Sequence, residues 1–107
     1  MSWKTSVNNA AAYYDFLGFV ISAAPDFPEE DYLEPHEQLT TRLAFEILRS
    51  GLSFFPRVRT EKPLRARLIQ LLDESESAFA EERWLDATTR LQRVDDILLG
   101  REDQTVH

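Results

Sequence analysis

The sequence contains no cysteine, and among its 107 residues only three are glycine and two are histidine. Without cysteine the chain cannot form a disulfide, a thiolate metal site or a cysteine nucleophile. The three glycines (Gly18, Gly51 and Gly100) are too far apart for a glycine-rich phosphate loop. These shortages exclude several common kinds of catalytic and cofactor-binding site.

The two histidines, His36 and His107, do not fall into a metal-binding motif. A His-Glu-x-x-His zinc motif would need a second histidine where Thr40 stands, and the Glu-x-x-His motif of di-iron bundles would need a glutamate in place of Leu33. The acidic stretch 73–76 lacks the spacing of a calcium-binding EF-hand. We therefore predict no bound metal and no cofactor.

No sequence motif indicates an enzyme. Gly-x-Ser-x-Gly, which marks one large class of serine hydrolases, is absent from the sequence. Nineteen acidic residues make some pair of carboxylates inevitable, so a carboxylate-dependent enzyme stays open as an alternative. We predict that the protein is not an enzyme.

Long hydrophobic runs are also missing. The most apolar stretch, residues 10–24, is interrupted by Asp15 and is shorter than the ~20 apolar residues that a membrane span needs. No basic N-terminus precedes an apolar run, so we expect no signal peptide and a cytoplasmic protein. The net charge of −7 disfavours binding to nucleic acid and to anionic membranes.

The apolar residues recur at helical spacing in four segments. The first runs from about Ser6 to Ala23, and the second from Pro35 or His36 to about Phe55. In the third, Thr60 is the predicted N-cap, Pro63 falls in the first turn, and the helix ends near position 82. The fourth carries a core stripe and is stopped by Gly100; the residues of that stripe are Trp84, Ala87, Leu91, Val94 and Leu98.

No segment alternates apolar and polar residues for long enough to predict a strand. We therefore expect an all-α fold, either a four-helix bundle or two stacked antiparallel helical hairpins. One helical domain covers residues 1–100, and residues 101–107 form a frayed polar tail.

The first helix is apolar on more than one side. Tyr14 and Leu17 lie on one side, and Phe16 and Phe19 lie on the other. Such a helix is covered on most sides by its own chain or by a partner. A homodimer through residues 7–21 is therefore one of our predictions, with a structural role for the protein as the alternative function.

Residues 66–98 resemble one tetratricopeptide hairpin. The residues that carry the resemblance are Ala78, the run Arg83-Trp84-Leu85-Asp86-Ala87, and Leu91. The glycine that usually precedes the aromatic residue is replaced here by Glu82 or Arg83. The resemblance implies a protein-binding scaffold, although such repeats need about three copies for stability and an ordinary helical hairpin explains the same residues.

Charge is segregated along the chain. Residues 25–37 contain six acids and no base, residues 56–68 contain five bases and one acid, and residues 69–107 contain ten acids and four bases. The acidic segment also holds aromatic residues and three prolines, as in an exposed interaction loop. The predicted partner-binding residues are Asp26, Phe27, Glu29, Glu30, Asp31, Tyr32, Glu34 and Glu37. The alternative is that this loop pairs with the basic segment 57–67 across the fold.

These observations favour a non-catalytic, acidic protein-binding module whose partner has a basic surface. In general character the chain resembles bacterial immunity proteins, antitoxins and effector chaperones. That resemblance implies that the protein binds another protein and neutralises or holds it.

Overall fold

The computed structural model describes residues 7–27 and 38–100, and within these ranges the chain is helical with no strand. The all-α prediction is confirmed, and the architecture is compatible with a helical bundle. The main helices are α2 (Ala10–Ala23), α3 (Thr41–Ser50), α5 (Lys62–Ala80) and α6 (Trp84–Leu98). A 3₁₀ helix (Gly51–Phe54) and the short helix α4 (Pro56–Thr60) connect α3 to α5.

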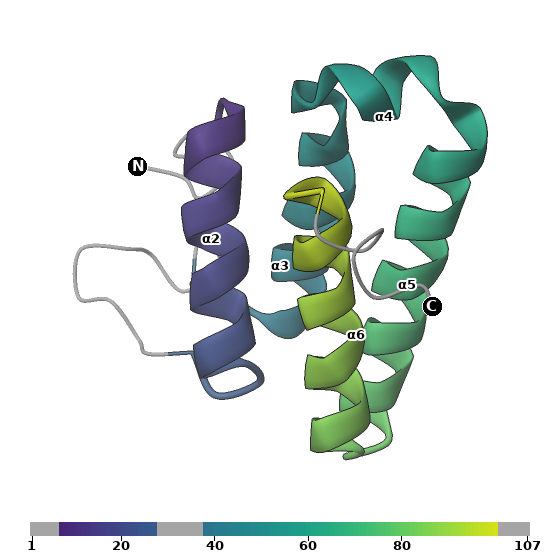
Figure 1. The fold of residues 1–107 in the computed structure, drawn as a ribbon. Helices are drawn as coiled ribbons and strands as arrows, with labels where there is room; N and C mark the ends of the chain where they lie inside the picture. Colours follow the sequence, from purple (N-terminus) through teal and green to yellow (C-terminus); the bar gives the residue numbers. More distant parts are fainter. Residues whose placement is uncertain (1–6, 28–37, 101–107) are drawn as a thin grey trace.

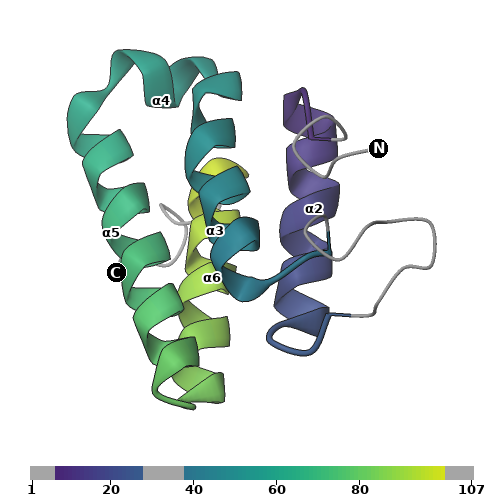
Figure 2. The ribbon, with the colours of Figure 1, turned by 180° about the vertical axis from the view of Figure 1, so that it is seen from behind.

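The four main helices lie roughly side by side, with α3 and α6 between α2 and α5 (Figures 1 and 2). The most extensive interface is that between α5 and α6, which form an antiparallel hairpin. α3 packs on α5, and α2 packs mainly on α6. α4 lies at one end of the molecule, and the α5–α6 turn lies at the other end (Figure 1).

The apolar residues of α2 are absorbed by the chain's own core. Tyr13 and Leu17 are fully buried, and Phe16 is nearly so. Tyr14 and Phe19 are half-buried and pack against the same core. The apolar surplus that motivated the predicted homodimer through residues 7–21 therefore has an explanation within one chain, although the dimer itself remains a prediction.

Capping residues determine where the first two long helices begin, and both begin later than predicted. The side chain of Asn9 accepts a hydrogen bond from the Ala12 amide at 2.8 Å, so α2 begins at Ala10 rather than near position 6. The hydroxyl of Thr40 accepts one from the Leu43 amide at 3.1 Å, so α3 begins at Thr41 rather than near position 35. In each case the cap satisfies an amide that the first turn leaves without a partner.

The predicted role of Thr60 was wrong, and that of Pro56 was incomplete. Pro56 does not only end a helix, because it is also the first residue of α4, where its missing N–H does no harm. Thr60 is the last residue of α4 rather than the N-cap of α5, and its hydroxyl donates to the carbonyls of Pro56 and Arg57. The prediction that Pro63 lies in the first turn of the next helix is confirmed.

Tyr13 joins α2 to the end of α3. Its side chain is fully buried, and its hydroxyl donates to the Leu48 carbonyl at 2.8 Å. The Phe55 ring meets the Tyr13 ring edge to face, with centroids 5.2 Å apart. Gly51 also lies against the ring, since a Cβ atom there would lie 2.4 Å from Cδ2 of Tyr13. The close approach of α2 to this segment thus requires a glycine at position 51.

Candidate functional site

The turn between α5 and α6 forms a tight helix cap. α5 ends at Ala80, and Glu82 follows in the left-handed region with φ of 60°. The Arg83 amide donates to the Ala78 carbonyl at 2.8 Å, and the Glu82 amide donates to the Phe79 carbonyl at 3.1 Å. This is the Schellman pattern, in which glycine is the usual residue at the left-handed position. Glu82 stands at one of the two positions where the tetratricopeptide resemblance lacks its glycine. Its backbone has the left-handed conformation that glycine usually adopts.

Replacing Glu82 by glycine should stabilise the fold. A residue with a Cβ atom strains the left-handed conformation, so we expect Glu82→Gly to raise the free energy of unfolding by about 1 kcal/mol. The midpoint of urea unfolding measures the change. Glu81→Gly is the matched control because Glu81 has φ of −94°, and it should give no gain. Equal effects of the two variants would contradict the strain at position 82.

Trp84 and Leu85 are exposed at the start of α6. Trp84 is 45% exposed and Leu85 is 82% exposed, and both count among the exposed large hydrophobic residues. One side of the Trp84 indole is supported by the Phe79 ring at a centroid distance of 6.1 Å, and Phe79 in turn meets Phe45 at 6.0 Å. The core therefore holds the indole in place while nearly half of its surface faces solvent.

The exposure of Trp84 corrects the sequence prediction, which placed this residue on the core stripe of the fourth helix. The remaining members of the stripe are buried or half-buried, so the periodicity was wrong only at its first position. The adjacent pair Trp84-Leu85 is not by itself a signal of exposure, because Ile47 and Leu48 are also adjacent on a helix and both are buried.

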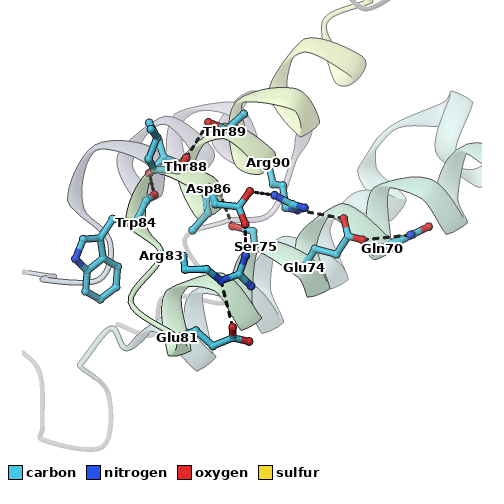
Figure 3. Close-up of polar contacts among 12 residues, drawn as sticks. Gln70, Glu74, Ser75, Glu81, Arg83, Trp84, Asp86, Thr88, Thr89 and Arg90 are labelled. Atoms are coloured by element: carbon cyan, nitrogen blue, oxygen red, sulfur yellow. Dashed lines mark hydrogen bonds and ion pairs between the residues drawn. The ribbon is translucent and has the colours of Figure 1, made fainter.

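Charged side chains form a network beside this apolar pair. Asp86 accepts hydrogen bonds from both Arg83 and Arg90, and these join the first two turns of α6 (Figure 3). Arg83 also reaches Glu81 at 3.2 Å, and Arg90 reaches Glu74 on α5 at 3.2 Å. The indole of Trp84 points away from the Arg90–Glu74 pair (Figure 3). Partly exposed pairs of this kind contribute about 0–1 kcal/mol each, so they orient the surface more than they stabilise the fold.

A second pair of contacts ties the last turn of α3 to α5. Arg49 donates to Asp73 at 2.8 Å and to Glu76, and its guanidinium lies 5.9 Å from the centre of the Phe45 ring. Burial by itself would lower the pKa of Arg49. The hydrogen bonds to Glu76 and Asp73 outweigh that effect and raise the pKa above its usual value. The Arg49 guanidinium is thus charged at neutral pH.

The network encloses a shallow hollow of about 340 Å³ between α5 and α6. The residues that line it are Asp73, Glu74, Ser77, Arg83 and Arg90. Asp73 accepts a hydrogen bond from Arg49, and Glu74 accepts one from Arg90. Both carboxylates are thus bound by guanidinium groups of the same chain.

The structure describes two of the predicted partner-binding residues. Asp26 is exposed, as an interaction residue should be. Phe27 is half-buried and packs against the core beside Phe19, with ring centroids 5.8 Å apart, so it points inward rather than acting as a free anchor. The remaining residues of the predicted site lie outside the described residues, and they are Glu29, Glu30, Asp31, Tyr32, Glu34 and Glu37.

The described part of the acidic loop is remote from the basic segment. Asp26 and Phe27 follow the end of α2 that lies toward the α5–α6 turn, whereas α4 lies at the opposite end (Figures 1 and 2). In the basic segment Arg57 pairs with Glu61 at 3.5 Å, and Arg59 donates to the Ser53 carbonyl at 2.7 Å. Internal pairing between the loop and this segment is therefore not made by Asp26.

No family model matches the chain, and comparisons with curated proteins and with solved structures find no match. Across residues 7–27 and 38–100, no helix combines the length and the apolar character needed to cross a membrane. In the same part of the chain, no three histidine, aspartate or glutamate side chains gather closely enough to hold a metal ion.

Proposed function

We propose that the protein is a non-catalytic, acidic binding module that engages a protein with a basic surface through the α5–α6 end. We name this surface the hairpin tip and define it by Glu81, Glu82, Arg83, Trp84, Leu85 and Asp86. The observation that carries the proposal is the exposure of Trp84 and Leu85. Among the classes that the sequence resembles, this activity is that of an immunity protein, an antitoxin or an effector chaperone.

The hairpin tip combines the two features that a protein-binding surface needs. Trp84 is a large, rigid anchor because Phe79 holds its ring, and exposed tryptophan is enriched among the residues that dominate binding energy. Residues 81–86 hold three acids and one arginine. The excess of negative charge in this segment favours a basic partner, since complementary charge speeds the encounter and orients the docking.

The helix contacts favour one bundle over two stacked hairpins. α6 packs on both α5 and α2, and α3 packs on both α5 and α2. Two separate hairpins would instead meet through one interface. We therefore include a four-helix bundle in the proposal, with the α5–α6 turn projecting from one end.

Affinity capture from native lysate tests the proposal. Wild-type protein should retain a basic protein at low salt and release it at high salt, because exposed charges are screened beyond about 10 Å at 0.1 M salt. The variant Trp84→Ala/Leu85→Asp should lose that protein. With the purified partner, removing a central aromatic anchor should weaken binding roughly thirtyfold, which corresponds to about 2 kcal/mol.

The matched control is Leu99→Asp. Leu99 is 46% exposed and therefore resembles Trp84 in exposure, but it lies beyond the far end of α6. This variant should retain the partner at the wild-type level. Equal retention by the tip variant and by wild-type protein would show that the hairpin tip is not the binding surface.

The same capture separates the tip from the predicted acidic loop. Replacing the loop acids by serine should slow association and reduce its salt dependence if the loop also faces the partner. Unchanged affinity and salt dependence in that variant would remove the loop from the mechanism. The residues replaced are Asp26, Glu29, Glu30, Asp31, Glu34 and Glu37.

A further inference from the structure

The end of the molecule opposite the hairpin tip carries a small apolar notch. It has a volume of about 100 Å³ and lies where α4 meets α5 and the last turn of α6. Its lining comes from the segment before α4, from α4 itself, and from both long helices; the residues are Phe55, Pro56, Arg57, Val58, Leu64, Ile97 and Leu98. Pockets for cofactors or drug-sized ligands measure about 300–1,000 Å³, so this notch has room for one side chain rather than for a small molecule.

The chain segment that forms one wall of the notch is rich in bases. Arg57 lines the notch and also pairs with Glu61 at 3.5 Å, and Arg59 and Lys62 are further bases on α4 and at the start of α5. All three side chains are exposed. Residues 56–68 hold five bases and one acid, Glu61, so this end favours an acidic partner.

The hairpin tip has the complementary shape and charge. Leu85 projects with 82% of its surface exposed, which makes it the most exposed of the three large hydrophobic side chains at the surface of the described chain. Glu81, Glu82 and Asp86 stand beside it in the sequence. An aliphatic side chain in a segment with more acids than bases thus lies at one end, and an apolar notch beside a segment with more bases than acids lies at the other.

We propose that the notch binds the hairpin tip of a second copy of this chain, with Leu85 as the inserted side chain. This inference deepens the proposed function and rests on it, since both use the hairpin tip. The two surfaces lie at opposite ends of the same molecule (Figure 1). Contact between different surfaces is heterologous, so each copy still offers one free end and the copies add head to tail.

Sedimentation velocity at increasing protein concentration tests self-association. Wild-type protein should form species larger than a dimer at low salt, within a concentration range that detects dissociation constants as weak as about 1 mM. High salt should reduce the association because the two segments are exposed and opposite in net charge. The variant Leu85→Asp removes the inserted side chain, and Arg57→Glu/Lys62→Glu reverses the charge of two bases in the segment beside the notch. Each variant alone should self-associate at least tenfold more weakly.

Mixing the two variants gives the decisive result. The Leu85→Asp protein keeps an intact notch, and the Arg57→Glu/Lys62→Glu protein keeps an intact tip. The mixture should therefore form a complex of one copy of each that cannot extend. Both variants carry changes at exposed positions, and their circular dichroism spectra check that they fold.

Three outcomes would overturn the inference. A wild-type protein that stays monomeric up to about 1 mM rejects the contact. Association that Leu85→Asp abolishes but the charge reversal leaves unchanged indicates a tip-to-tip dimer instead. Association that neither variant weakens places the interface elsewhere.

These outcomes are separate from failure of the proposed function. If wild-type protein is monomeric but captures a basic protein that Trp84→Ala/Leu85→Asp loses, the binding module stands and the second copy is rejected. If the protein forms chains and captures nothing else, the tip binds its own notch and the separate basic partner is rejected.

Discussion

Replacing Gly51 by alanine should lower the free energy of unfolding by about 3 kcal/mol. The backbone of Gly51 is helical, with φ of −75°, so alanine would be favoured there if space allowed. The new Cβ atom would instead lie 2.4 Å and 2.7 Å from two carbons of the Tyr13 ring. That ring cannot move away easily, because its hydroxyl is bound to the Leu48 carbonyl and the Phe55 ring packs against it. Forcing extra volume into a packed core costs about 1–3 kcal/mol, and here the obstructing atoms belong to a rigid ring.

Gly18 provides the matched control. It lies in the middle of α2, and a Cβ atom at this position would have no heavy atom within 4 Å, so alanine fits there. Gly18→Ala should raise the free energy of unfolding by about 0.5–1 kcal/mol, because glycine is a poor helix former. Urea unfolding of both variants measures the contrast. A stabilised Gly51→Ala protein would show that α2 does not approach α3 as closely as described.

Replacing Tyr13 by phenylalanine should make stability less sensitive to alkaline pH. Burial raises the pKa of the Tyr13 hydroxyl far above its usual value of 10, and the neighbouring Tyr14 raises it further. The unfolded chain ionises at about pH 10 while the folded chain does not. The contribution of the Tyr13 hydroxyl to the free energy of unfolding is therefore fully present below pH 10. Above pH 10 this contribution falls by about 1.4 kcal/mol for each pH unit.

The phenylalanine variant should cross the wild-type protein in stability. Near pH 8 it should be less stable by about 1 kcal/mol, because the Leu48 carbonyl loses its hydrogen bond. At about pH 11.5 the wild-type protein has lost roughly 2 kcal/mol through Tyr13, so the variant should be the more stable of the two. Urea unfolding from pH 8 to 11.5 measures the difference. A constant difference across this range would contradict the buried state of the hydroxyl.

Tyr14→Phe is the control for this titration. The hydroxyl of Tyr14 also donates to a carbonyl, that of Leu98, at 2.8 Å. Its side chain is only half-buried, and its pKa is raised by burial and by Asp95, while Arg57 acts in the opposite direction. We therefore expect a smaller change with pH in the Tyr14 variant than in the Tyr13 variant.

Apolar periodicity was sufficient to predict the all-helical class and the position of α6. The four predicted segments contain the four main helices, since a core stripe at helical spacing leaves few alternatives. The starting residues were harder to predict because several residues near each start can act as caps. Ser6 and Asn9 are both good N-caps, and only the hydrogen bond to Ala12 shows that Asn9 is used.

The connection from α3 to α5 could not be predicted from local signals. A proline can follow the end of one helix or occupy the first turn of the next. Pro56 was interpreted only in the first way, so the short helix α4 was missed. Thr60 has the chemistry of an N-cap but donates its hydroxyl back into α4. The role of Thr60 depends on its position at the last residue of α4. The preference of threonine for N-cap positions does not say where a helix begins or ends.

The hairpin tip was visible in the sequence only as part of the tetratricopeptide resemblance. Arg83-Trp84-Leu85-Asp86 was identified there, but Trp84 was assigned to the core. Solvent exposure depends on whether another helix covers the start of α6, and no local pattern reports this. The predicted acidic loop was chosen from composition alone, and the structure places Phe27, one of its two described residues, against the core.

The order of the helices along the chain has a consequence for folding kinetics. α5 and α6 are separated by only three residues, so their large interface consists of contacts that are local in sequence. The contacts between α2 and α6 join residues separated by more than half of the chain. The hydrogen bond between Tyr14 and Leu98 is an example. Local contacts form at a low loop-closure cost, so the α5–α6 hairpin is expected to fold early and α2 to dock late. The hairpin tip therefore belongs to the part of the chain that folds first.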